Sequence, residues 1–211
     1  VCIGYKAGQA ITNASACTFI GREAGENLNS TYGFAIGYQA LDTATTAVNS
    51  MAIGAFALKN GGTNNIAIGF NSARTATGAA TQSVSIGNES GYANQGDDNT
   101  FVGHRAGYAV TTGDDNVFVG SKAGEAVTTG SNNIVIGYDT DSSSATVSNE
   151  ITLGNASHTS LRIPGLQSGA SDGQVLTYNS TNGNITLADA SGGGGSGMSR
   201  AQATAITLIF G

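Results

Sequence analysis

Hydrophobic and polar positions follow one short phrase that recurs along most of this chain. In each copy an aliphatic residue stands directly before a glycine, and a second, mostly apolar residue stands two places earlier. Residues two apart lie on the same face of a β-strand, and the β-branched Ile and Val that dominate these positions suit strands. Each copy therefore predicts a short strand that ends at a glycine corner.

The corner glycine returns at a nearly constant interval of 15 to 18 residues. The glycines concerned are Gly4, Gly21, Gly37, Gly54, Gly69, Gly87, Gly103, Gly120, Gly137 and Gly154. Clusters of Gly, Asn and Asp, which favour turns, separate the copies. A single unit of this size buries almost nothing, whereas a stack of units shares a continuous core. The pattern predicts an all-β fold: a repetitive parallel β-roll or β-solenoid of about ten 17-residue coils, each with two short strands and two turns.

We assign the aliphatic column before the glycine to the core of the repeat, together with the apolar column two places earlier. The core column consists of Ile20, Ile36, Ile53, Ile68, Ile86, Val102, Val119 and Ile136.

The column between them points to the opposite face of the strand, yet it is also mostly apolar. We predict that another copy of the chain covers it, because a solvent-facing column would be polar. The predicted contacts between chains are Phe19, Ala35, Ala52, Ala67, Phe101, Phe118 and Val135.

The repeat ends at Gly154, which divides the chain into a repeat shaft over residues 1–154 and a different C-terminal part. Residues 155–190 are expected to form a small β cap, with a hairpin between Gln174–Tyr178 and Asn184–Ala188, because an Asn-Gly turn signal separates the two runs. Residues 191–197 read as a Gly/Ser linker. Residues 198–211 form an apolar terminal segment.

Charge and composition exclude several classes of protein. The formal net charge of −6 disfavours nucleic acid, because phosphate binding needs clustered Lys and Arg. No apolar run is long enough for a membrane-spanning helix, so no membrane insertion is expected. The 39% of hydrophobic residues, regularly spaced, indicates ordered structure despite 32 glycines.

Residues suited to chemistry are sparse. The two histidines, His104 and His158, do not cluster with the two cysteines, so neither a zinc spacing nor a catalytic constellation is present. We expect no enzymatic activity and no cofactor, with Ca²⁺ as the one candidate ligand. Two acidic turns one repeat apart place four carboxylates in neighbouring coils: Asp97, Asp98, Asp114 and Asp115. Oxygen ligands of this kind suit Ca²⁺, and solvated turn aspartates are the simpler interpretation.

Aromatic residues recur directly after four of the corner glycines. They are Tyr5, Tyr38, Phe70 and Tyr138. This column is either a surface that stacks on receptor sugars or ordinary packing on a pleated sheet.

The repeat phrases resemble two known families. "NNIAIGFNSA", "DNVFVGSKAG" and "NNIVIGYDTD" are similar to the head repeats of trimeric autotransporter adhesins. The longer-spaced form, "NTFVGHRAGYAVTTGDDNVFVGSKAG", resembles the shafts of bacteriophage tail fibres. The resemblance implies a left-handed parallel β-roll in which three chains pack side by side as a homotrimer. No coiled-coil stalk or membrane barrel like that of the adhesins is visible, which favours the fibre unless the sequence is a fragment.

These observations predict a non-enzymatic structural protein of a phage tail fibre or similar appendage, on the virion or at a cell surface. A stiff trimeric rod would present binding surfaces to a glycan or protein receptor of a host and would join other tail or appendage proteins. A bacterial surface adhesin head is the first alternative. A fibre-borne polysaccharide depolymerase, which would use the acid cluster, is the second.

Overall fold

The computed structural model describes residues 1–12, 15–28, 31–44, 48–75 and 80–161, and the backbone of 174–178 and 185–189. The chain separates into two compact units, Val1–His158 and Thr159–Gly211. The first unit contains the repeats, and its boundary lies four residues beyond the last corner glycine.

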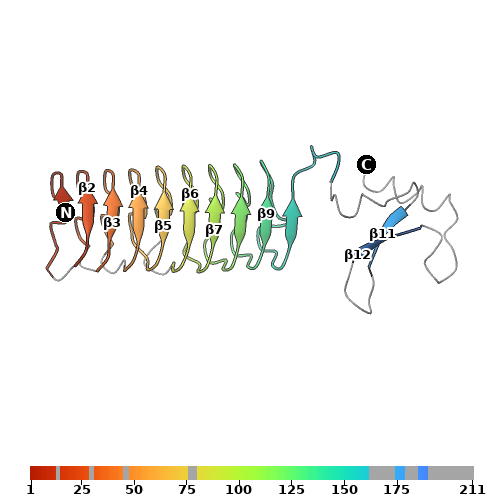
Figure 1. The fold of residues 1–211 in the computed structure, drawn as a ribbon, viewed down its shortest axis with the longest axis horizontal. Coiled ribbons are helices and arrows are strands. Elements are labelled where there is room, and N and C mark those ends of the chain that lie inside the picture. Colours follow the sequence, from red (N-terminus) through yellow and green to blue (C-terminus); the bar gives the residue numbers. More distant parts are fainter. Residues whose placement is uncertain are drawn as a thin grey trace. The chain divides into compact units, whose positions relative to one another are not determined.

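The first unit is an all-β solenoid whose repeats each contribute one strand to a single parallel sheet (Figure 1). The strands are β1 (Cys2–Ile3), β2 (Thr18–Ile20), β3 (Phe34–Ile36), β4 (Met51–Ile53), β5 (Ile66–Ile68), β6 (Val84–Ile86), β7 (Thr100–Val102), β8 (Val117–Val119), β9 (Ile134–Ile136) and β10 (Ile151–Leu153). They lie in sequence order, and equivalent residues face each other, as Phe101, Phe118 and Val135 do. The predicted β-solenoid is confirmed.

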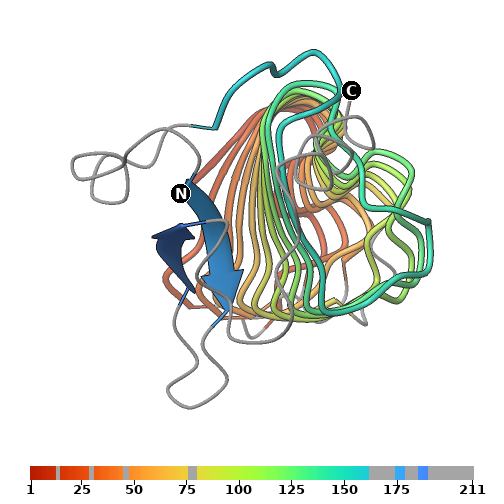
Figure 2. The same cartoon turned by 90° about the vertical axis from the view of Figure 1, so that its right-hand side faces the viewer.

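Each coil holds one strand in the described residues rather than the two that we expected. Left-handed backbone confines the strand, because residues five before and two after the corner glycine have positive φ, as at Asp98 (φ 55°) and Arg105 (φ 56°). Hydrogen bonds between coils nevertheless continue past the strand, from Lys122 N to His104 O (2.8 Å) and from Gly124 N to Thr140 O (2.8 Å). Viewed along the solenoid, successive coils therefore overlay (Figure 2).

The structure reverses the two faces that we assigned to the strand. The middle column points into the coil and is fully buried: Phe19, Ala35, Ala52, Ala67, Phe101, Phe118 and Val135 are all 0% exposed. The predicted core column points outward and is half-buried or exposed: Ile20, Ile36, Ile53, Ile68, Val102 and Val119 are partly covered, while Ile86 and Ile136 are 37% and 43% exposed. Alternate residues of a strand face opposite ways. The interior of the coil is already filled where the middle residue is Phe, because a Cβ at Gly124 would lie 2.3 Å from the Phe118 ring, so the two flanking residues point outward.

Complementary volumes explain how one interior accepts both Phe and Ala. Where the strand carries Phe118, the residue four after the corner glycine is Gly124, and a Cβ there would lie 2.3 Å from the Phe118 ring. Where the strand carries Ala52, that position holds Leu58, which is fully buried. The pairs Phe19 with Gly25, Phe101 with Gly107 and Ala35 with Leu41 follow the same rule. In these five coils a large side chain at one position accompanies a small one at the other, as dense packing requires. The fifth and sixth coils do not follow the rule, because they pair Ala67 with Ala73 and Ser85 with Gly91.

A buried polar ladder runs beside this core, four residues before the corner glycine. Asn116 donates its backbone N–H to Asn99 Oδ1 (2.9 Å) and its side chain to Gly130 O (2.9 Å). Its own Oδ1 accepts the backbone N–H of Asn133 (3.0 Å). Each asparagine therefore satisfies backbone groups of the adjacent coil that would otherwise be buried without a partner.

The second unit contains the predicted hairpin. β11 (Gln174–Tyr178) pairs antiparallel with β12 (Ile185–Asp189), one residue later than the expected second strand. The remainder of the predicted cap beyond Leu161, the 191–197 linker and the 198–211 apolar segment lie outside the described residues.

Candidate functional site

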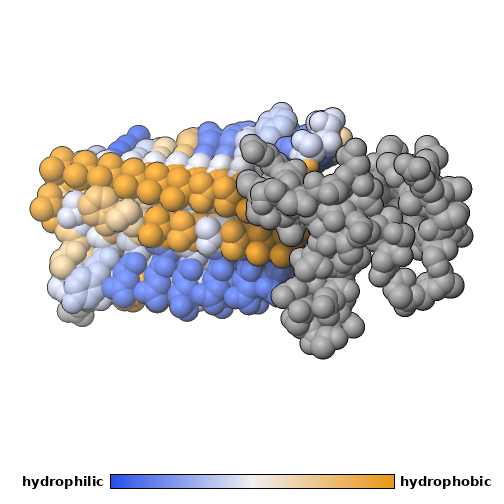
Figure 3. Space-filling model, turned by 45° about the vertical axis from the view of Figure 1, so that its right-hand side comes forward, coloured by the Kyte–Doolittle hydropathy of each residue, from blue (hydrophilic) through white to orange (hydrophobic). Residues whose placement is uncertain are grey.

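An apolar surface covers the outer face of the parallel sheet. We call it the outer stripe; it comprises the first and third strand positions of each repeat, namely Val1, Ile3, Thr18, Ile20, Phe34, Ile36, Met51, Ile53, Ile66, Ile68, Val84, Ile86, Thr100, Val102, Val117, Val119, Ile134, Ile136, Ile151 and Leu153. All but two are apolar. Figure 3 shows adjacent hydrophobic rows running along the solenoid, bordered by a hydrophilic row.

The outer stripe is large for a surface exposed to water. Nine of its residues are between 36% and 72% exposed. The four most exposed, Val1, Ile3, Ile151 and Leu153, lie in the two end coils, and the other five are 36% to 43% exposed. Monomeric soluble proteins rarely expose long contiguous apolar patches, and such patches mark sites of interaction with another molecule.

A second surface lies just past the corner glycine, where five consecutive coils each place one flat side chain. We call it the corner ladder: Tyr5, Arg22, Tyr38, Phe56 and Phe70. The Arg22 guanidinium lies 5.9 Å from the Tyr5 ring centre and 5.5 Å from that of Tyr38. The rings of Tyr38 and Phe56 (5.1 Å) and of Phe56 and Phe70 (6.0 Å) then meet edge to face. The structure thus joins three of the four predicted receptor-facing aromatics.

Tyr138, the fourth predicted aromatic, stands apart from this ladder. It follows the corner glycine of the ninth repeat and is 65% exposed. Its ring meets no other aromatic ring or cation among the described residues.

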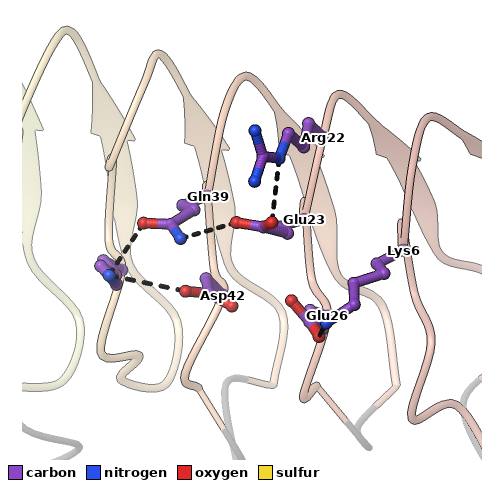
Figure 4. Close-up of polar contacts among 7 residues, drawn as sticks. Lys6, Arg22, Glu23, Glu26, Gln39 and Asp42 are labelled. Atoms are coloured by element: carbon purple, nitrogen blue, oxygen red, sulfur yellow. Dashed lines mark hydrogen bonds and ion pairs between the residues drawn. The ribbon is translucent and has the colours of Figure 1, made fainter.

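A network of polar side chains borders the corner ladder (Figure 4). Glu23 accepts hydrogen bonds from Arg22 Nε (2.9 Å) and Gln39 Nε2 (2.7 Å), and these bonds, that of Gln39 first, lower the pKa of the Glu23 carboxyl. Lys59 donates to Gln39 Oε1 (2.9 Å) and lies 3.6 Å from Asp42 Oδ2. Burial raises the pKa of Asp42 despite this ammonium group. Hydrogen bonds thus link the side chains of three consecutive coils.

Sequence analysis missed this network, although a signal for it exists. The residue two after one corner glycine contacts the residue five after the next: Lys6 meets Glu26 (2.7 Å) and Arg105 meets Glu125 (2.7 Å). The same offset brings Arg74 over the Phe56 ring at 4.9 Å. Comparing these two columns between neighbouring repeats, instead of reading each alone, would have revealed complementary pairs.

Two carboxylates of the acidic turns accept hydrogen bonds from neighbouring coils. Asp97 Oδ1 accepts hydrogen bonds from the backbone N–H (2.7 Å) and hydroxyl (2.8 Å) of Thr81, and Asp114 Oδ1 accepts the backbone N–H of Asp97 (2.8 Å). Asp98 and Asp115 are exposed in left-handed turn conformations. No group of three or more His, Cys, Asp or Glu side chains suited to a metal ion occurs in the described part of the chain. The predicted Ca²⁺ cluster is therefore not assembled.

Neither histidine belongs to a cluster of metal-binding side chains in the described part of the chain. His104 is exposed after its corner glycine, and His158 Nδ1 accepts a hydrogen bond from the backbone N–H of Asn155 (3.1 Å).

Within the described residues, no helix is long and apolar enough to span a bilayer.

Comparison with models of known protein families, with curated proteins and with solved structures found no match for this chain. The outer stripe and the corner ladder are therefore the features from which function is inferred.

Proposed function

We propose that this chain is a non-enzymatic structural protein, the stiff shaft of a phage tail fibre or a similar surface appendage. Three copies associate side by side through their outer stripes, and the rod presents binding surfaces to a host receptor. This role places it on the virion or at a cell surface, joined to other appendage proteins. A bacterial adhesin head works by the same physical means.

The observation that carries the proposal is the outer stripe. Exposing a row of aliphatic side chains is unfavourable in water, and burying it against identical stripes removes that cost. A straight stripe on a repetitive rod is matched along its whole length by a second copy of itself. The resemblance of the repeat phrases to adhesin heads and tail-fibre shafts favours three copies.

The residues that we first assigned to contacts between chains have no part in this interface. Phe101 and Phe118 fill the interior of their coils, so replacing them disturbs folding rather than association. A depolymerase is not favoured, because the Asp97 and Asp114 carboxylates hold backbone groups of neighbouring coils.

Solution mass, measured by light scattering, tests the proposal. We expect the wild-type chain to have three times its single-chain mass of 21.0 kDa. Replacing Ile86 and Ile136 together with Lys should reduce the mass to that of one chain, because both side chains already reach the surface and the coil interior is untouched.

The matched control adds two lysines away from the stripe, at the exposed Thr112 and Thr129. It should retain the assembled mass, and circular dichroism should show equal β content in all three proteins. A monomeric wild type, or an assembly that survives the stripe substitutions, contradicts the proposal.

A further inference from the structure

We propose that the corner ladder binds an acidic polysaccharide laid along the solenoid axis. The inference rests on the proposed function, since it names the ligand class of a receptor-binding surface on the rod. It is drawn from the rings, cations and hydrogen-bonding groups of the first five coils.

Three of the four ladder rings are exposed, and the fourth, Phe56, is half-buried. Tyr5 is 66%, Tyr38 38% and Phe70 47% exposed, whereas the three phenylalanines of the middle column are fully buried in the same solenoid. Exposed aromatic faces in a row offer stacking surface to the C–H faces of a flat ligand at little loss of side-chain freedom. The spacing between coils, about 4.8 Å, is close to the length of one pyranose residue along a chain.

Among the described residues, cations lie over three of the four ladder rings, those of Tyr5, Tyr38 and Phe56. All four basic residues of the first five coils lie over ladder rings: Lys6 and Arg22 over Tyr5, and Lys59 and Arg74 over Phe56. Arg74 makes no ion pair with a carboxylate among the described residues. A guanidinium held by a ring keeps its N–H groups available for a ligand carboxylate, which it binds in a bidentate manner.

Charge along the chain points to the same end of the solenoid. Residues 1–75 carry four basic and three acidic side chains, a net charge of +1, whereas residues 76–211 carry four basic and eleven acidic ones. An acidic ligand is therefore repelled less by the first five coils than by the rest of the chain.

The number of cations favours a sugar over a nucleic acid. The carboxylates of Glu26, Glu23 and Asp42 lie in the second and third coils and pair with Lys6, Arg22 and Lys59 (Figure 4). Glu23 and Asp42 are buried, so Arg74 is the ladder cation without a carboxylate partner among the described residues. A polynucleotide, with one phosphate per residue, needs a denser cluster of cations than these four provide.

Isothermal titration with oligogalacturonate, alginate oligomers and hyaluronan tests the proposal on the full chain, with dextran as the neutral comparison and poly-dT as the nucleic acid. We expect binding to at least one acidic glycan and weaker binding as ionic strength rises. Tyr38→Ser and Arg74→Gln should each weaken it about tenfold or more.

Tyr138→Ser is the matched control, because Tyr138 occupies the same repeat position as Tyr38 but lies outside the ladder. It should bind like the wild type. Equal losses in Tyr138→Ser and Tyr38→Ser, binding to none of the acidic glycans, or stronger binding to dextran or poly-dT would each overturn the inference.

Light scattering on the same variants separates the inference from the proposed function. Ladder variants that lose the glycan but keep the assembled mass support both. An assembled wild type that binds no glycan contradicts the glycan-binding inference alone. A monomer that binds acidic glycans through Tyr38 contradicts only the proposed trimeric shaft.

Discussion

At the scale of single residues, the interior of each coil is decided by one pair of side chains. Phe118 fits because the position facing it is Gly124, and Ala52 leaves the room that Leu58 occupies. Leu58 adopts a left-handed backbone (φ 46°) to do so, a conformation that costs most residues on the order of 1 kcal/mol. The same left-handed conformation recurs at this repeat position in Leu41 (φ 53°) and Ala73 (φ 47°), so the path of the coil imposes it.

A double-mutant cycle on Phe118 and Gly124 measures this complementarity. Phe118→Ala should lower the free energy of unfolding by about 3–5 kcal/mol through the cavity that it leaves. Gly124→Leu should also destabilise, because its Cβ would lie 2.3 Å from the ring. The double variant should recover more than about 1 kcal/mol relative to the sum, measured by urea denaturation.

The outcome also tests which way the strand faces. If the losses of unfolding free energy in the two single variants simply add in the double variant, the two side chains do not share one interior. Phe118 would then point to the outer surface, as the sequence first suggested. Ser121→Ala, at a half-buried position on the same coil, is the control and should change stability by less than about 0.5 kcal/mol.

At the scale of one structural element, the last coil is held by a carboxylate where its predecessors use asparagine. Glu150 continues the column of Asn99, Asn116 and Asn133, and its backbone N–H donates to Asn133 Oδ1 (2.9 Å). Its carboxylate accepts hydrogen bonds from the Ser143 backbone N–H (2.7 Å), the Ser143 hydroxyl (2.5 Å) and the Thr152 hydroxyl (2.8 Å). These bonds, led by that of the Ser143 side chain, lower the pKa of Glu150 below its ordinary 4.5.

The last coil should therefore loosen in acid. A carboxyl whose pKa is lower in the folded state stabilises the fold fully above its ordinary pKa, and this contribution is lost as the pH falls through the lowered value. Hydrogen exchange of the Ser143 amide, corrected for its intrinsic pH dependence, should show protection falling across that interval. Glu150→Gln should remove the pH dependence, and a wild-type protection that stays constant to low pH would refute the assignment.

At the scale of the whole solenoid, the core is not continuous. One cluster of buried apolar residues extends from Phe19 to Ala80, and another from Phe101 to Val135. Between them the sixth coil places Ser85, Ser90 and Asn94 inside. Solenoid stability depends on the contact of each coil with its neighbours. We therefore expect the sixth coil to contribute less apolar packing to the stability of the solenoid than the other coils.

Two serines of the sixth coil should respond to substitution in opposite directions. The Ser85 hydroxyl is buried without a hydrogen-bond partner among the described residues, while the Ser90 hydroxyl donates to Phe101 O (3.0 Å). Ser85→Ala should raise the free energy of unfolding by about 1 kcal/mol, and Ser90→Ala should lower it by about the same amount. Thermal unfolding of the two variants beside the wild type checks both signs, and a Ser85→Ala protein less stable than the wild type would show that its hydroxyl has a partner.

The sequence was sufficient for the architecture, because ten registered copies of one phrase can share a core only as a stack. It also located the corner glycines and the hairpin, since both depend on local backbone preferences. It was not sufficient for the direction of the strand. Both faces of the strand are apolar, so polarity could not distinguish inside from outside, and only the match of Phe118 with Gly124 across the coil does so.

The candidate functional surfaces were likewise only partly predictable from the sequence. The aromatic column was visible in the sequence, but its continuation through Arg22 and Phe56 depends on which side chains neighbouring coils bring together. The acidic turns looked like a metal cluster because stacking places them one coil apart, yet the structure directs Asp97 and Asp114 at backbone N–H groups. Period and turn chemistry are local and can be read along the chain, whereas the direction and partners of a side chain are set only once the coils are closed and stacked.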